Sequence, residues 1–307
     1  MNGIDRREFV RRSLQMALAT ATVGGVPLLD LFALPAQASG QGPALAVRKG
    51  RDIAALLRET LGALGGMGAF VKSGDSVVVK PNIGWDRTVE LGANTHPLVV
   101  RAVVEHCLEA GAKTVRIFDR TCNDPRRCYV QSGIQEAVES LRSERVRVEH
   151  MDRRAYRELD IAAGQDLKRW SFYQPALEAD SFINLPVAKH HSISMLTLGM
   201  KNIMGVIGGN RGQLHQNIAD SLTDINSVVH STLTIVDATR ILVANGPQGG
   251  RLEDVRVLDT LIASTDIVAA DAYASTLFGF RPEQISTIAT AAKRGLGTMD
   301  LARVRMV

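Results

Sequence analysis

The sequence is poor in cysteine, in aromatic residues and in net charge, and each shortage excludes a class of protein. Three cysteines among 307 residues are too few for a disulfide scaffold, and no C-x2-C-x2-C run occurs. We therefore expect no iron–sulfur cluster of the chain's own. The formal charge is only +4, and no basic run follows the first 38 residues, so we expect no nucleic-acid partner. With 45% hydrophobic and 22% charged residues, the composition is that of a globular protein.

A long uninterrupted apolar run is also missing. Residues 14–34 are apolar but are broken by Gly24-Gly25, Pro27 and Asp30, so they fall short of the about 20 apolar residues of a spanning helix. This stretch follows Arg6-Arg7 and precedes a small-residue cleavage site at residues 36–38. The order resembles the twin-arginine export signal, which a receptor reads as an address. We predict a signal peptide at residues 1–38, export to the periplasm by the twin-arginine translocase, and no membrane anchor after cleavage.

Short β-branched runs alternate with segments of helical periodicity, which favours a parallel α/β architecture. The predicted strands are residues 76–80, 114–119, 146–149, 181–185, 232–237 and 257–263. The predicted helices are residues 97–110, 131–141, 214–228, 266–278 and 283–293. The strands read as continuous apolar stretches, as expected when both faces are covered. We predict an open, mostly parallel, twisted sheet with helices on both faces (Rossmann-like) in one domain, residues 39–307, with a cap or insertion at 187–213.

Polar residues recur where the predicted strands end. Lys80 and Asn82 end one strand, Asp119 and Asp237 end two others, and Lys189 with His191 follows a fourth. Open parallel sheets bind ligands outside the carboxyl ends of their strands, so we expect these groups to share one rim. Each residue alone has a structural alternative, since a terminal Asp often caps the next helix and a lysine often reaches water.

Two further segments are predicted to join this rim. Lys201 and Asn202 lie in an apolar, glycine-flanked stretch, where a lysine is costly to bury without an anion or acceptors around it. The glycine-rich residues 208–212 precede the helix that begins near His215, and free N–H groups there could cradle an anion. The alternative is a mobile loop with a helix start. The pattern is neither a P-loop nor a dinucleotide fingerprint, so neither ATP nor NAD is supported.

Three lysines on one rim favour an anionic ligand, and their mutual repulsion could lower a lysine pKa and make one of them a general base. The predicted catalytic residues are Lys80, Lys189, His191, Lys201 and His215. The predicted substrate-binding residues are Asn82, His96 and Asn202. Imidazoles together with carboxylates from Asp119, Asp220 and Asp237 could bind a divalent metal, although no H-E-x-x-H spacing supports this.

The cysteines separate into a core residue and a loop pair. Cys107 lies on the apolar side of a predicted helix, whereas Cys122 and Cys128 lie together in one loop. In an oxidising periplasm these two could form a disulfide, and a metal pair is the weaker alternative because no other ligands have the right spacing.

Several motifs in sequence order resemble the bacterial and archaeal domain-of-unknown-function family 362. They are Val-Val-Lys80-Pro81-Asn82, Asn184-Leu185-Pro186, Gly199-Met200-Lys201-Asn202, Leu214-His215, Ile-Val-Asp237-Ala, Asn245-Gly246-Pro247 and Ser264-Thr265-Asp266. The resemblance spans residues 76–280 and adds Asn245 to the substrate-binding residues. It implies an exported protein. Some members are fused to ferredoxin-type modules, which implies redox chemistry and, for this chain, a redox partner protein.

The sequence thus predicts an exported α/β enzyme that binds an anionic small molecule or cofactor at the strand ends. A second hypothesis is a periplasmic factor that binds a cofactor, or serves a redox partner in maturation, without turnover. A third is that the rim residues are caps and core hydrogen bonds only.

Overall fold

The computed structural model describes residues 42–307, so the predicted signal peptide at 1–38 lies outside the described residues. A ten-stranded sheet forms the centre, with the order β12-β1-β11-β10-β7-β2-β3-β4 and with β8 and β9 joined beside β10. Its strands are β1 (Ala44–Lys49), β2 (Ser76–Pro81), β3 (Thr114–Ile117), β4 (Val146–Val148), β7 (Ser181–Leu185), β8 (Val187–His191), β9 (Met195–Thr197), β10 (Leu233–Leu242), β11 (Val255–Ser264) and β12 (Arg305–Met306). A separate hairpin pairs β5 (Tyr156–Asp160) with β6 (Arg169–Tyr173).

The strand directions divide the sheet into two parts. The run from β4 through β3, β2 and β7 to β10 is parallel, and β8 is also parallel to β10. The remaining part contains antiparallel pairs, in which β11 lies between β10 and β1. This open, mostly parallel sheet in a single α/β domain confirms the predicted fold class.

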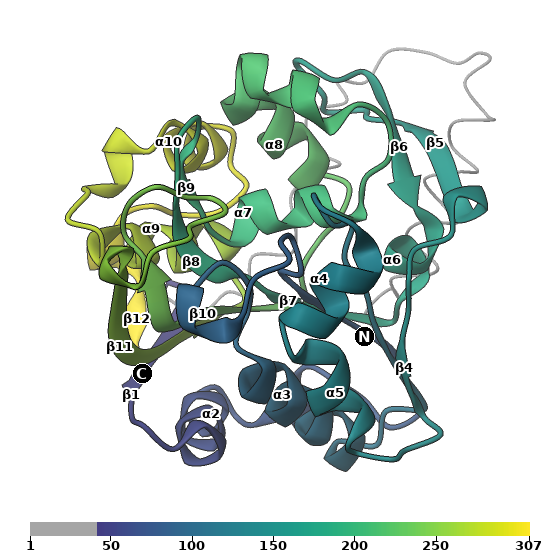
Figure 1. Ribbon diagram of the computed structural model, residues 1–307. Coiled ribbons are helices and arrows are strands. Elements are labelled where there is room, and N and C mark those ends of the chain that lie inside the picture. Colours follow the sequence, from purple (N-terminus) through teal and green to yellow (C-terminus); the bar gives the residue numbers. More distant parts are fainter. Residues whose placement is uncertain (1–41) are drawn as a thin grey trace, which may run out of the picture.

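Helices cover both faces of the sheet (Figure 1). They are α2 (Ile53–Gly62), α3 (Pro97–Glu109), α4 (Pro125–Gln131), α5 (Ile134–Glu139), α6 (Gln174–Glu178), α7 (Gly199–Asn202), α8 (Ile218–Asn226), α9 (Ile267–Thr276) and α10 (Ser286–Lys293). Side chains alternate along β2: Val77 and Val79 join the core that α2 and α3 cover, while Val78 joins the core on the face of α8. Since both faces are buried, β2 is apolar throughout until its last residues.

The structure refines the predicted elements. The strand at 181–185 has the predicted bounds, whereas the predicted helix at 131–141 begins only at Ile134, because Gly133 has a left-handed φ of 70° and separates α4 from α5. The helix predicted at 214–228 starts as a 3-10 turn, Arg211–Asn217, before α8. The segment at 187–213, predicted as a cap or insertion, supplies β8 and β9 to the main sheet.

The longest helix of residues 42–307 is α3, with 13 residues. No helix in this part of the chain combines the length and the apolar character that crossing a bilayer requires.

Candidate functional site

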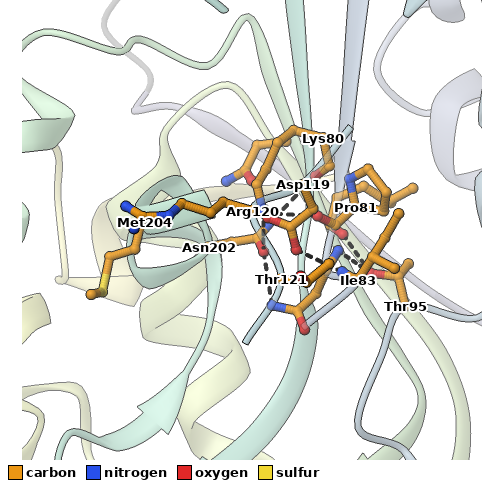
Figure 2. A network of polar contacts seen from close by, with 12 residues as sticks. Lys80, Pro81, Ile83, Thr95, Asp119, Arg120, Thr121, Asn202 and Met204 are labelled. Carbon is orange, nitrogen blue, oxygen red and sulfur yellow. Dashed lines mark hydrogen bonds and ion pairs between the residues drawn. The ribbon is translucent and has the colours of Figure 1, made fainter. Parts of the chain in front are cut away.

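A buried ion pair joins the ends of two neighbouring strands. Lys80 is the penultimate residue of β2, and Asp119 follows β3, so the parallel pairing of β2 with β3 brings them to the same edge. The Lys80 Nζ lies 2.8 Å from Asp119 Oδ1, and both side chains are almost completely buried (Figure 2). Asp119 Oδ2 accepts a hydrogen bond of 2.7 Å from the Ile83 amide. Burial lowers the pKa of Lys80, and the Asp119 carboxylate opposes that shift.

Asn202 connects this pair to α7 and β7. Its Oδ1 accepts from Lys80 Nζ at 2.9 Å and from Asn82 Nδ2 at 3.1 Å. Its Nδ2 donates to the Lys80 carbonyl at 3.1 Å and to Asn184 Oδ1 at 2.8 Å. All four hydrogen-bonding positions of the amide are therefore used within the protein. Asn202, predicted to bind substrate, positions Lys80 in this structure.

The short helix α7 is fixed by an acid that the sequence reasoning missed. Asp271 of α9 accepts hydrogen bonds from the Gly199 amide at 2.6 Å and the Met200 amide at 2.9 Å. Burial raises the pKa of Asp271 to about 7, although the two backbone donors oppose this shift. The available signal was a single acid among the small apolar residues of a helix, Ala269-Ala270-Asp271-Ala272.

Lys189 of β8 is buried, and no carboxylate among the described residues pairs with it. Its Nζ donates to Asn82 Oδ1 at 3.0 Å and to the Ala93 carbonyl. Burial is the main cause that lowers the pKa of Lys189 to about 7. Lys80 and Lys201 lower it further, while Cys122 and Asp119 act in the opposite direction, so these residues lie within electrostatic range of Lys189.

Lys201 of α7 contacts a histidine instead of an acid. Its Nζ lies 3.0 Å from His215 Nε2 and 3.5 Å from Met204 Sδ. The other ring nitrogen of His215 is 3.2 Å from the Gly212 carbonyl, which can only accept, so His215 carries its proton on Nδ1 and offers a lone pair to Lys201. Burial lowers the pKa of Lys201 to about 8, and Arg211 adds to this shift.

A second histidine stacks on His215. The ring centroids of His191 and His215 are 5.4 Å apart with 19° between the ring planes. His191 Nδ1 accepts from the amides of Ile193 and Ser194, so its proton lies on Nε2. Burial, followed by repulsion from Lys201, lowers the pKa of His191 to about 3; burial also lowers that of His215. Both rings are therefore neutral at pH 7.

Two arginines, neither of them predicted, cross-link the loops beside the lysines. Arg211 donates to the carbonyls of Arg120, Met204 and Thr121, while Arg120 donates to those of Ile207 and Gly209. Burial lowers the pKa of Arg120, and Arg211 contributes to the same shift. We use "lysine cluster" for Lys80, Lys189 and Lys201. Within residues 42–307, Asp119 is the carboxylate that pairs with this cluster, through Lys80, while both arginines donate to backbone carbonyls.

Other predicted site residues make different contacts. Asp237 accepts from the His96 amide at 2.7 Å and from Thr239, and His96 caps the start of α3 through Leu98. Asp220 lies 3.4 Å from Arg294. Asn245 is exposed and donates to Asp254.

The structure therefore does not bring the three aspartates predicted as metal ligands together. Asp119, Asp220 and Asp237 are each held by a different partner. Within residues 42–307, no group of three or more His, Cys, Asp or Glu side chains is placed to hold a metal ion.

The proposed loop disulfide is not formed in the structure. Cys122 and Cys128 are both free, Cys122 being exposed and Cys128 buried. Cys128 lies in the first turn of α4, and its Sγ donates to the Gly84 carbonyl at 3.7 Å. The helix thus turns the Cys128 thiol inward, while Cys122 remains in the preceding loop.

Gly205 packs directly on the ion pair. A Cβ at this position would lie 1.8 Å from Asp119 Oδ1 and 2.4 Å from Lys80 Nζ. We expect Gly205→Ala to lower the free energy of unfolding by about 1–3 kcal/mol through overpacking, measured by urea denaturation. The control is Gly68→Ala, where a Cβ meets nothing within 4 Å. Equal midpoints for the two variants would contradict this account of the packing.

The amino-acid sequence is similar to a described protein family and to a cyanobacterial protein. The family model described as Domain of unknown function (DUF362) matches residues 77–276. The chain is similar to a thylakoid-associated protein of Synechocystis sp., with 29% identity over 254 residues, which cover 80% of this chain and 76% of that protein.

Two solved structures are more distant. The lactate racemase apoprotein from Thermoanaerobacterium thermosaccharolyticum has a TM-score of 0.45 at 10% identity, over 81% of this chain and 58% of that chain. A protein from Thermotoga maritima has a TM-score of 0.41 at 13% identity, over 74% and 59% of the two chains. This chain therefore spans less than two thirds of either solved protein, and scores this low carry no information about its activity.

Proposed function

The chain belongs to the DUF362 family, and we propose that it is an enzyme that binds an anionic small molecule at the lysine cluster. One observation carries the proposal: three lysines lie buried together, and within residues 42–307 only Lys80 has a carboxylate partner, Asp119. Their exposed fractions are 0% for Lys80, 1% for Lys189 and 9% for Lys201.

Electrostatics explain why such a cluster favours an anion. A buried ammonium loses its hydration, and carbonyl or amide oxygens replace only part of that stabilisation. An anion in contact with Lys189 and Lys201 would supply the missing negative charge and would gain charge-assisted hydrogen bonds from both. Arg120 and Arg211 strengthen the positive potential, because neither guanidinium contacts a carboxylate among the described residues.

The histidines supply groups for proton transfer. His215 presents an Nε2 lone pair to Lys201, and His191, stacked on it, keeps a proton on Nε2. A base and a donor of opposite tautomer thus lie beside the proposed anion, as general acid–base catalysis requires. Solvent reaches this side of the cluster at Cys122, Gly212 and Gln213, which are exposed.

The proposal predicts a specific pH dependence for anion binding. We expect sulfate to raise the melting temperature relative to chloride at equal ionic strength, since a ligand of the folded state stabilises it. Lys189, with its pKa lowered to about 7, and Lys201, lowered to about 8, lose their charge as pH rises. The increase in melting temperature caused by sulfate should therefore be largest near pH 6 and decline steadily towards pH 9. The charge of sulfate stays constant over this range. The measurement is differential scanning fluorimetry across this range.

Two variants complete that test. Lys201→Met should remove most of the sulfate effect, whereas Lys113→Met, at an exposed lysine before β3, should retain it. If the sulfate-induced increase in melting temperature were independent of pH and unchanged in Lys201→Met, the proposed anion site would be contradicted.

We also propose that the protein is exported through the twin-arginine route, on the order of motifs in residues 1–38. Replacing Arg6-Arg7 with two lysines should leave the protein in the cytoplasm, as measured by cell fractionation. Periplasmic recovery of that variant at the level of the native sequence would contradict the proposal.

A further inference from the structure

The three lysines differ in how well their ammonium groups are solvated by the protein. Lys80 Nζ contacts three oxygens, those of Asp119, Pro81 and Asn202, and Lys189 Nζ contacts two, those of Asn82 and Ala93. Within residues 42–307, the hydrogen-bonding neighbours of Lys201 Nζ are a ring nitrogen of His215 and the sulfur of Met204 instead of oxygens. The described part of the chain therefore offers the Lys201 ammonium fewer oxygen acceptors than it offers Lys80 or Lys189.

The partner of Lys201 also provides a destination for its proton. His215 Nε2 lies 3.0 Å from Nζ with its lone pair free, because the ring proton is on Nδ1 beside the Gly212 carbonyl. Among the other groups near Lys201, Arg211 lowers its pKa and Cys122 acts in the opposite direction, while Lys189 and His191 also lie within electrostatic range of it. A neutral amine with a neighbouring base is the condition for a nucleophilic lysine.

Lys201 is also the most accessible of the three. It is 9% exposed, against 0% for Lys80 and 1% for Lys189, and its partner His215 is half-buried. Lys189 and Arg211, which lie within electrostatic range of Lys201, would be available for the negative charge of a ligand bound there.

We propose that Lys201 is a catalytic nucleophile that forms an imine with an anionic carbonyl compound, such as a 2-oxo acid or an aldehyde carboxylate. This inference rests on the proposed anion site and names its substrate class. Neutral Nζ attacks the carbonyl carbon, a C–N bond forms, the carbonyl π pair moves to oxygen, and one Nζ proton passes through His215 to that oxygen. In the resulting carbinolamine the nitrogen lone pair forms the C=N bond as the C–O bond breaks, and the second Nζ proton passes through His215 to the departing hydroxyl, which leaves as water. The net change is amine plus carbonyl to imine plus water.

An imine at Lys201 would give the two neighbouring histidines a role in proton transfer. Once protonated, an imine withdraws electrons from the adjacent carbon, so a C–H or C–carboxylate bond there is weakened. His191 and His215 lie where a proton could be removed or delivered. The carboxylate of the substrate would meanwhile occupy the positive potential of Lys189 and Arg211.

Reductive trapping tests the inference directly. The full chain is incubated with glyoxylate and sodium cyanoborohydride, and the modified lysine is identified by intact mass and peptide mapping. We expect one adduct, on Lys201, with sulfate protecting against it. Lys201→Arg should abolish trapping, since a guanidinium forms no imine under these conditions. His215→Gln should slow trapping by at least about 10²-fold, the usual contribution of a general base.

The controls separate the two proposals. Lys113→Arg should trap at the native rate, and acetaldehyde, which has no charge, should react without preference for Lys201. Sulfate binding without any Lys201 adduct, or an adduct that forms equally on surface lysines, would overturn the imine and leave the anion site intact. If the folded native chain neither bound sulfate nor formed an adduct on Lys201, the anion site and the imine would both be overturned.

Discussion

Replacing Asp119 with asparagine should lower the free energy of unfolding by about 3–5 kcal/mol, the usual cost of leaving one partner of a buried ion pair without the other. Lys80 is fully buried, and Asp119 is the only acid in contact with it among the described residues. The amide of asparagine keeps the size of the side chain, removes the charge, and turns a donor instead of an acceptor towards either Lys80 or the Ile83 amide. Urea denaturation followed by circular dichroism measures the change.

The effect should also depend on pH with a definite sign. Without Asp119, burial leaves the pKa of Lys80 further below its value in the unfolded chain. Between those two pKa values the unfolded state binds more protons, so the stability of Asp119→Asn should recover as pH rises. The decrease in the free energy of unfolding caused by Asp119→Asn should therefore be larger at pH 6 than at pH 9.

An exposed aspartate provides the matched control. Asp160→Asn removes a carboxylate 3.6 Å from Arg169, in a pair whose two side chains are mostly exposed. Such pairs contribute about 0–1 kcal/mol, so this variant should unfold almost as the native protein does. If Asp119→Asn and Asp160→Asn unfolded at the same urea concentration, the Lys80–Asp119 pair would not have the structural role described above.

Replacing Lys189 with methionine should stabilise the fold while weakening anion binding. Burial lowers the pKa of Lys189 from 10.5 to about 7. That shift corresponds to about 4–5 kcal/mol of destabilisation at low pH. Methionine removes this cost but leaves Asn82 Oδ1 and the Ala93 carbonyl without their donor, at about 1–1.5 kcal/mol each. The expected net gain is about 2 kcal/mol.

This gain has its own pH signature. The native protein should become more stable as pH rises from about 7 towards 10.5, because the unfolded chain keeps the Lys189 proton that the folded chain has lost. Lys189→Met lacks this dependence, so its advantage should be greatest below pH 7. The same variant should bind sulfate at least about tenfold more weakly, since one charge-assisted hydrogen bond is lost. If Lys189→Met were less stable than the native protein at pH 6 and bound sulfate equally well, both the expected gain in stability and the role of Lys189 in anion binding would be contradicted.

The sequence predicted that the ends of β2 and β3 lie at the same edge of the sheet, but not which other residues lie beside them. The expectation that strand ends share one rim follows from parallel pairing alone, and it places Lys80 against Asp119. Which residues turn towards that rim depends on long-range packing instead. Asp237 ends a predicted strand but faces the start of α3, because the chain after Ala93 returns over β10 and presents the His96 amide to it.

The supporting residues were the least predictable part. Asp271 holds α7 in place by accepting a hydrogen bond from an amide 72 positions away in the sequence. Arg211 donates hydrogen bonds to the backbone carbonyls of the loop at 120–121. Neither contact has a local pattern, since each depends on where two distant loops meet. The split of α4 from α5 was partly visible in Gly133, yet only the left-handed backbone there shows that the helix must end. Similarly, the neutrality of both histidines follows from their burial beside Lys201, which the sequence does not show.

Diffraction from crystals grown with selenate, a heavier analogue of sulfate, tests the central claim most directly, because anomalous scattering identifies the anion without reference to any assumed reaction. We predict a selenate bound within hydrogen-bonding distance of Lys189 Nζ or Lys201 Nζ in the native protein, and its absence from Lys201→Met. Selenate bound only at the surface, beside a well-ordered and unoccupied lysine cluster, would contradict the account.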